Sequence, residues 1–124
     1  MIEYTVEVHP SGSKYWLLNK QLHREDGPAI ERINGDKFWY LNGQLHREDG
    51  PAIEWSDGTK HWNLNGEFHR EDGPAIECSN GSKFWYLYDK NLTEEEHKEA
   101  LNPTVEMTVE DICKALGKNV KVVK

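Results

Sequence analysis

The sequence predicts a mainly β protein, a repeat-built antiparallel β-meander of 23-residue hairpin units with a short α-helical C-terminal cap. Three observations lead to this prediction. The octapeptide HREDGPAI occurs three times at a constant interval, starting at His23, His46 and His69. Apolar residues alternate with period two in the segments between the copies, as they do in strands. Asn-Gly or Asp-Gly pairs separate the apolar segments, which is typical of hairpin turns.

Four columns of identical residues keep the 23-residue interval through four copies. They are Gly12, Gly35, Gly58 and Gly81; Lys14, Lys37, Lys60 and Lys83; Trp16, Trp39, Trp62 and Trp85; and Leu18, Leu41, Leu64 and Leu87. The fourth copy then departs from the pattern at LYDKNLT, so we expect three full units and one partial unit.

Each unit contains two turn signals and therefore about two strands. Asn42-Gly43 and Asn65-Gly66 fit a type I′ turn, which needs positive φ at both central residues. Asn34-Gly35 and its equivalents mark the second turn of each unit. Between the turns, KFWYL from Lys37 is short and aromatic, as a strand is.

Alternation along these strands assigns the two faces of the sheet. The Trp and Leu columns share one face and do not vary, so we expect them to form the core. They are joined there by Leu22, Leu45, Phe68, Ile30, Ile53 and Ile76. The opposite face changes between aromatic and polar residues, as a surface does. Its members are Tyr15, Leu17, Phe38, Tyr40, His61, Asn63, Phe84 and Tyr86.

The two ends of the chain lack the octapeptide and are expected to close the sheet. Residues 2–8 alternate as a first strand. Thr93 and Glu96 form a capping box that opens a helix, which must stop before Pro103. We expect a second helix from Thr108, with a stripe of Val109, Ile112, Cys113 and Leu116, and a last strand from Val120. The predicted division is therefore a repeat sheet over residues 1–92 and a cap over residues 93–124, with the helices covering the fourth unit.

The octapeptide is interpreted as a structural bend. It is identical in all copies, whereas the 15 residues before the third copy match those before the second at only 7 positions. We expect Asp to accept from backbone N–H groups, Gly to adopt an unusual φ, and Arg24 to reach Asp26 or Asp49 of the next unit. The structural set is His23, Arg24, Asp26, Gly27, His46, Arg47, Asp49, Gly50, His69, Arg70, Asp72 and Gly73.

Composition and charge narrow the function. The net charge is −7 and no basic cluster occurs, which disfavours nucleic acid and membrane surfaces as partners. Cys78 and Cys113 fit free thiols in a reducing compartment, and no segment has membrane-spanning length, so a cytoplasmic protein is predicted. Three equal copies offer no differentiated catalytic pocket and no metal-ligand spacing. We therefore expect no catalytic residues, no metal and no cofactor.

The stretch DGTKHWNLNGEFHREDGPAIE resembles a MORN-type repeat, in which a DG turn, an aromatic strand, an NG turn and a following His recur. The resemblance covers about residues 11–92. Trp62 and its equivalents depart from the usual pattern, and in this respect the chain is similar to the LHREDGPA variant found in bacteriophage and large-virus proteins. The resemblance implies an elongated scaffold for protein binding. The viral variant further implies a small inhibitor of a host or defence protein, acting in the host cytoplasm.

A non-catalytic protein-binding module is therefore the predicted function. Outward aromatic residues rimmed by acidic ones suit a protein partner with a basic surface. The predicted partner-binding residues are Tyr15, Phe38, Tyr40, Glu48, Asp49 and Glu54. One alternative is a structural scaffold or homo-oligomeric assembly component, such as a homodimer. A second alternative is a small enzyme or metal-binding protein.

Overall fold

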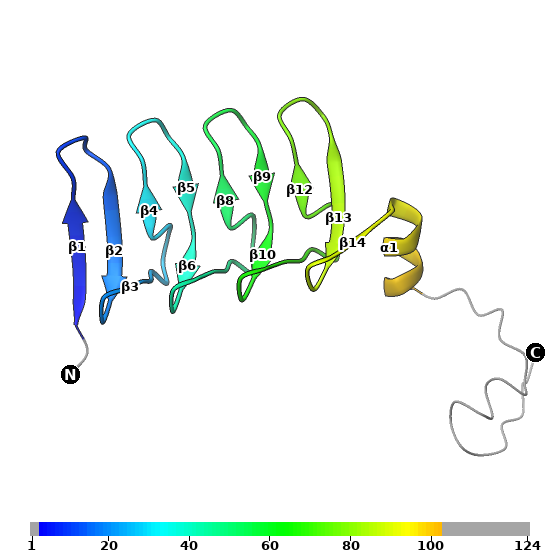
Figure 1. Cartoon of the computed structure of the whole chain (residues 1–124), viewed down its shortest axis with the longest axis horizontal. Helices are drawn as coiled ribbons and strands as arrows, with labels where there is room; N and C mark the ends of the chain where they lie inside the picture. The colour runs from blue at the N-terminus through cyan, green and yellow to red at the C-terminus, as the bar shows by residue number, and fades with distance from the viewer. Residues whose placement is uncertain (1–2, 103–124) are drawn as a thin grey trace, which may run out of the picture.

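The computed structural model describes residues 3–102, which form a row of strands followed by one helix (Figure 1). The longest strands lie near the ends of the row: β1 (Tyr4–Val8), β2 (Lys14–Leu18) and β13 (Lys83–Leu87). The remaining elements are β3 (Gln21–Leu22), β4 (Ile30–Glu31), β5 (Lys37–Phe38), β6 (Tyr40–Leu41), β7 (Gln44–Leu45), β8 (Ile53–Glu54), β9 (Lys60–His61), β10 (Asn63–Leu64), β11 (Glu67–Phe68), β12 (Ile76–Glu77), β14 (Lys90–Leu92) and α1 (Glu94–Leu101).

Strands of successive units pair antiparallel in one continuous ten-stranded sheet. Its order is β1-β2-β4-β5-β8-β9-β12-β13-β14, with β3 paired to β2. Two short hairpins, β6-β7 and β10-β11, form at the lower ends of the units in Figure 1. The predicted repeat-built meander is therefore confirmed.

The turns follow the residues that specify them. Asn42 has φ 51° and Gly43 has φ 78°, and Asn65 and Gly66 repeat this pair with φ 49° and 83°. Positive φ at both positions confirms the predicted type I′ geometry. The second turn of the unit also contains a glycine with positive φ, for example Gly35 at 101°.

The buried residues lie on the face opposite to the one that we expected. The register places Ile30 opposite both Tyr15 and Phe38, and Phe38 opposite Ile53. Directly paired residues share a face of a sheet, so the isoleucines lie beside the Phe and Tyr side chains and away from the Trp column. The predicted core is therefore wrong for the Trp and Leu columns. Ile30 and Ile53, which we also expected in the core, are buried, and Leu22 and Leu45 pack against them as expected.

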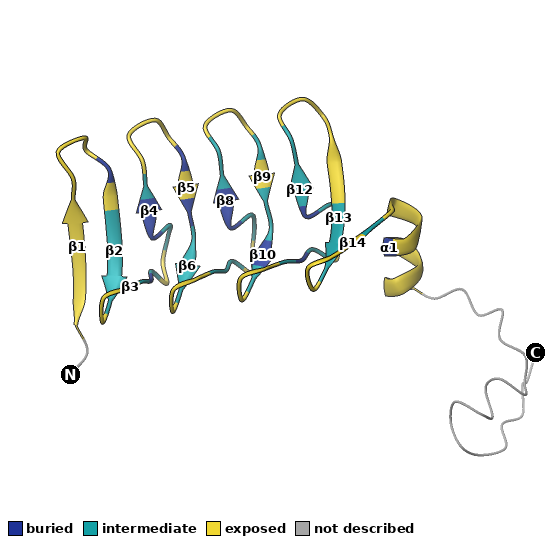
Figure 2. Cartoon of the chain, viewed as in Figure 1, coloured by how far each residue is buried: buried dark blue, intermediate teal, exposed yellow. Residues whose placement is uncertain are grey.

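The core of residues 3–102 is small because the strands of this part of the chain form a single layer. Ile30, Phe38 and Ile53 form its buried cluster, and the side chains packed against them are those of Tyr15, Leu22, Tyr40, Leu45 and Trp55. Figure 2 shows β4 and β8 as buried or partly buried, whereas β1 is exposed along its whole length. Stability therefore comes from many small contacts between neighbouring units.

The helix α1 begins and ends as predicted. The Thr93 hydroxyl accepts from the Glu96 N–H at 3.1 Å, and the Glu96 carboxylate accepts from the Thr93 N–H at 2.9 Å. This capping box opens the helix, which ends at Leu101 and packs against β13 and β14. Within residues 3–102 no helix is long and apolar enough to cross a membrane.

The rest of the predicted cap lies outside the described residues. It comprises the second helix from Thr108, its stripe of Val109, Ile112, Cys113 and Leu116, and the strand from Val120.

Candidate functional site: grooves on the tryptophan face

The tryptophan face is the side of the sheet that carries Trp16, Trp39, Trp62, Trp85 and the three octapeptides. Two backbone hydrogen bonds join each octapeptide to one tryptophan. The Trp39 N–H donates to the Ala52 carbonyl at 2.7 Å, and the Trp39 carbonyl accepts from the His46 N–H at 3.0 Å. Equivalent bonds hold the first octapeptide to Trp16 and the third to Trp62. Each octapeptide is thus held against the tryptophan of its own unit.

An arginine fills the space between the octapeptide and its tryptophan. The Arg47 guanidinium carbon lies 4.0 Å from the centre of the Trp39 ring, which is a cation–π contact. Arg47 Nε donates to Asp49 at 3.0 Å, and Arg47 Nη1 donates to the Pro51 carbonyl at 3.1 Å. The other two octapeptides repeat these contacts. Of the two aspartate partners that we considered, the arginine therefore pairs with the one in its own octapeptide.

The glycine of the octapeptide makes room for this arginine. A Cβ atom at Gly50 would lie 2.9 Å from Cζ of Arg47, and equivalent distances of 2.9 and 2.8 Å apply at Gly27 and Gly73. None of these three glycines has positive φ, so the predicted unusual backbone conformation is wrong. The absence of a side chain at these glycines lets the guanidinium group approach closely, and a Cβ atom there would displace it.

The histidine of the octapeptide joins one unit to the next. His46 Nδ1 accepts from the Asn65 N–H at 2.9 Å, and His23 accepts from the Asn42 N–H at 2.8 Å. Because Nδ1 accepts, the proton of the neutral ring lies on Nε2, which is 3.4 Å from Glu48 in the second octapeptide. Both ring nitrogens are thus engaged within the fold. This arrangement agrees with the structural role that the repeat predicts for these histidines.

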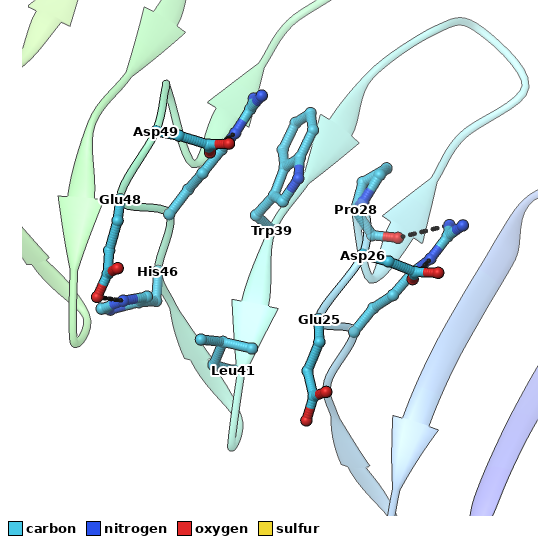
Figure 3. Close-up of a pocket in the computed structure, with 11 residues that line it drawn as sticks. Glu25, Asp26, Pro28, Trp39, Leu41, His46, Glu48 and Asp49 are labelled. Carbon is cyan, nitrogen blue, oxygen red and sulfur yellow. Dashed lines mark hydrogen bonds and ion pairs between the residues drawn. The ribbon is translucent and has the colours of Figure 1, made fainter.

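Grooves separate successive octapeptides (Figure 3). One, of about 650 Å³, is lined by Trp39 and Leu41 and lies between residues 24–28 and 46–49. The next, of about 630 Å³, has Trp62 and Leu64 in the same positions. Equivalent positions in neighbouring units therefore form equivalent grooves.

Two smaller hollows continue the row of grooves at its ends. The hollow at Trp16 is bordered by β1 and has a volume of about 450 Å³, and that at Trp85 is bordered by α1 and has about 530 Å³. His97 of α1 is buried and its Nε2 lies 2.6 Å from the Arg70 carbonyl. The helix thus stands beside the third octapeptide where a fourth octapeptide would otherwise lie.

The walls of these grooves are acidic. The side chains of Glu48 and Asp49 are 83% and 86% exposed, and the other octapeptides present their Glu and Asp in the same way. The groove at Trp39 contains four carboxylates and two guanidinium groups, a net charge of −2 with neutral His46. Hydrogen bonding to Arg24 and its charge lower the pKa of Asp26, which favours the ionised form of this carboxyl group.

The structure divides the predicted partner-binding residues between the two faces. Phe38 is buried in the core, and Tyr15 and Tyr40 are half-buried against it, so their predicted exposure is wrong. The acidic members lie on the tryptophan face: Glu48 and Asp49 line the grooves, and Glu54 pairs with Arg47 at 3.5 Å.

Sequence reasoning missed one further feature of the tryptophan face. Lys and Glu alternate across the sheet at directly paired positions, for example Glu31, Lys37 and Glu54. Opposite charges at paired positions favour this register. The signal was present, because both residue types recur at the 23-residue interval.

Among residues 3–102 no group of three His, Cys, Asp or Glu is placed to hold a metal ion. Comparison of the chain with protein-family models, with curated proteins and with solved structures gave no match.

Proposed function

We propose that this protein is a non-catalytic protein-binding module whose tryptophan face holds a basic partner. The observation that carries the proposal is the row of grooves, each with an indole ring and exposed carboxylates. Indole rings and carboxylates both attract cations, and Trp is among the residues that dominate binding energy in interfaces. The overall charge of −7 would further speed the approach of a positively charged protein.

Repetition of the site supports binding over catalysis. General acid–base chemistry needs groups of different pKa in one enclosed place. Here the same groups recur in open grooves at the same positions of each octapeptide. Inhibition of a host or defence protein in the cytoplasm extends the proposal, and this extension rests on the resemblance to the viral repeat variant.

The test compares the proteins that the wild-type chain binds in a pull-down experiment with those that a variant binds. The variant Glu25→Gln/Glu48→Gln/Glu71→Gln removes one carboxylate from each octapeptide while keeping side-chain size. We expect wild-type protein to capture partners that this variant loses at equal salt concentration. Retention of the same partners by the variant would contradict the use of this face.

The exposed strand β1 favours homo-oligomeric assembly as a second candidate. Tyr4, Val6 and Val8 are 63%, 52% and 65% exposed, and within residues 3–102 β1 pairs with β2 alone. Open edge strands with apolar side chains tend to pair with other chains. Antiparallel pairing of two copies about Val6 would place Thr5 opposite Glu7 and keep like charges apart.

Sedimentation of the wild-type protein and of Val6→Lys tests this second candidate. A dimer that becomes a monomer in the variant would support pairing through β1. A wild-type protein that stays monomeric over the accessible concentration range would exclude it.

A further inference from the structure

We infer that the partner segment on the tryptophan face is a basic polyproline II helix with Lys or Arg at every third position. This inference rests on the proposed function and adds the conformation and spacing of the ligand. It follows from the interval between the grooves, from their lining and from their charge.

The interval between grooves is set by the sheet. Each complete unit contributes two strands to the ten-stranded sheet, as β8 and β9 do. Adjacent strands lie about 4.8 Å apart, so equivalent residues of successive units, two strands on, lie about 9.6 Å apart. The grooves at Trp39 and Trp62 therefore recur at this interval along the row.

A polyproline II helix matches this interval closely. It has three residues per turn and a rise of about 3.1 Å, so every third side chain returns to the same side after about 9.3 Å. A β-strand returns a side chain to one face every two residues, after about 6.7 Å, which does not match. An α-helix with cations at heptad spacing advances about 10.5 Å from one cation to the next. This spacing exceeds the interval between grooves, and the mismatch accumulates to roughly 3 Å over three intervals.

The lining of the grooves suits the same ligand. Trp39 carries Arg47 against its ring, and Pro28 of the preceding octapeptide lies across the groove (Figure 3). Polyproline II segments dock in aromatic-lined grooves, and their preformed conformation lowers the entropy cost of binding. One cation per groove would then meet the carboxylates of Glu25 and Glu48 in the walls.

Two synthetic peptides of equal composition test the spacing. RPPRPPRPPRPP places Arg at every third position. RRPPPPRRPPPP has the same charge and the same proline content, but its Arg residues occur in adjacent pairs. Measured by calorimetry at moderate salt, the first peptide should bind at least about tenfold more tightly than the second. An α-helical peptide with four Arg at heptad spacing should bind no better than the second.

Two protein variants locate the binding. Glu25→Gln/Glu48→Gln changes both walls of the Trp39 groove and should weaken binding of the phased peptide by about tenfold. Glu7→Gln/Glu95→Gln makes the same change in net charge away from all four hollows and should change affinity by less than about twofold. Melting curves are expected to show that both variants fold like the wild type, because Glu25 and Glu48 are highly exposed.

The outcomes separate the two proposals. If both proline-rich peptides bind equally and only the groove variant weakens them, the basic-partner proposal stands and the spacing is overturned. Preference for the helical peptide would also overturn it. If no cationic peptide binds, or if the two variants weaken binding equally, both proposals fail.

Discussion

The two faces of the sheet are built from the same strands, yet they tolerate change differently. On the tryptophan face, each unit presents the same ring at the same position. On the core face, the neighbouring column reads Tyr15, Phe38, His61 and Phe84, and this variable column is the one that lies beside the buried isoleucines. The octapeptide residues Ala29, Ile30, Ala52, Ile53 and Ala75 are also constant, and they are buried. Within this protein, constancy between repeats therefore marks the specific contacts of the tryptophan face as well as burial in the octapeptide.

The contacts of one tryptophan show why it does not vary. The backbone of Trp39 forms hydrogen bonds with both ends of the octapeptide, and its ring contacts Arg47. Arg47 in turn lies close to Gly50 and donates a hydrogen bond to Asp49. A change at any of these residues disturbs the others. Phe38 meets the Trp55 ring edge-on, with 5.3 Å between the ring centres, and the Arg32 guanidinium carbon lies 5.0 Å from the Phe38 ring centre. In contrast to Trp39, however, most of its neighbours in the core are apolar side chains that other rings can pack against.

The largest expected effect tests which face is the core. Phe38→Ala removes a ring that is only 8% exposed and should lower the free energy of unfolding by about 3 kcal/mol. Phe84→Ala, in the same column but 44% exposed, should cost less than half as much. Denaturant unfolding of both variants gives the comparison. Equal losses would show that the column is not buried as described.

An intermediate effect tests the linked contacts of the tryptophan face. Gly50→Ala should displace the Arg47 side chain and lower the free energy of unfolding by about 1–2 kcal/mol. Because the loss acts through the arginine, Gly50→Ala should cost much less when Arg47→Ala is already present. A double-mutant cycle should give a coupling of at least about 0.5 kcal/mol. Additive losses would mean that the glycine serves another purpose.

The smallest expected effect concerns pH and the core face. Burial lowers the pKa of His61 below its ordinary value of 6.5. The unfolded chain therefore binds this proton before the folded chain does, so stability is lost as the pH falls through about 6.5. His61→Phe should reduce that loss, by less than about 1 kcal/mol because the ring is only half-buried. Identical pH profiles of the melting temperature for the two proteins would refute this role.

The sequence was sufficient to predict the fold and the positions of its turns and of the helix start. The 23-residue interval predicted the meander, Asn42-Gly43 predicted a type I′ turn, and Thr93 with Glu96 predicted the start of α1. These features depend on local residue chemistry, which a single sequence displays directly.

The assignment of the faces failed because period-two alternation does not say which face is inside. In a two-layered protein the constant apolar face is usually the core. In this one-layered sheet the Trp rings are instead covered in part by Arg24, Arg47 and Arg70 of the octapeptides. The sequence predicted a structural bend in each octapeptide, but the grooves depend on how successive copies lie beside one another, which a single copy does not display.

The measurement that tests the use of the two faces most directly is a nuclear magnetic resonance titration with RPPRPPRPPRPP. The five indole N–H signals report on both faces, because four tryptophans lie on the tryptophan face while Trp55 packs against the core. We expect the signals of Trp39 and Trp62 to shift, whereas those of Trp55 and of the Ile30 and Ile53 methyl groups should stay in place. Shifts confined to Trp55 and the isoleucines would contradict it, and would return the binding site to the Phe and Tyr face.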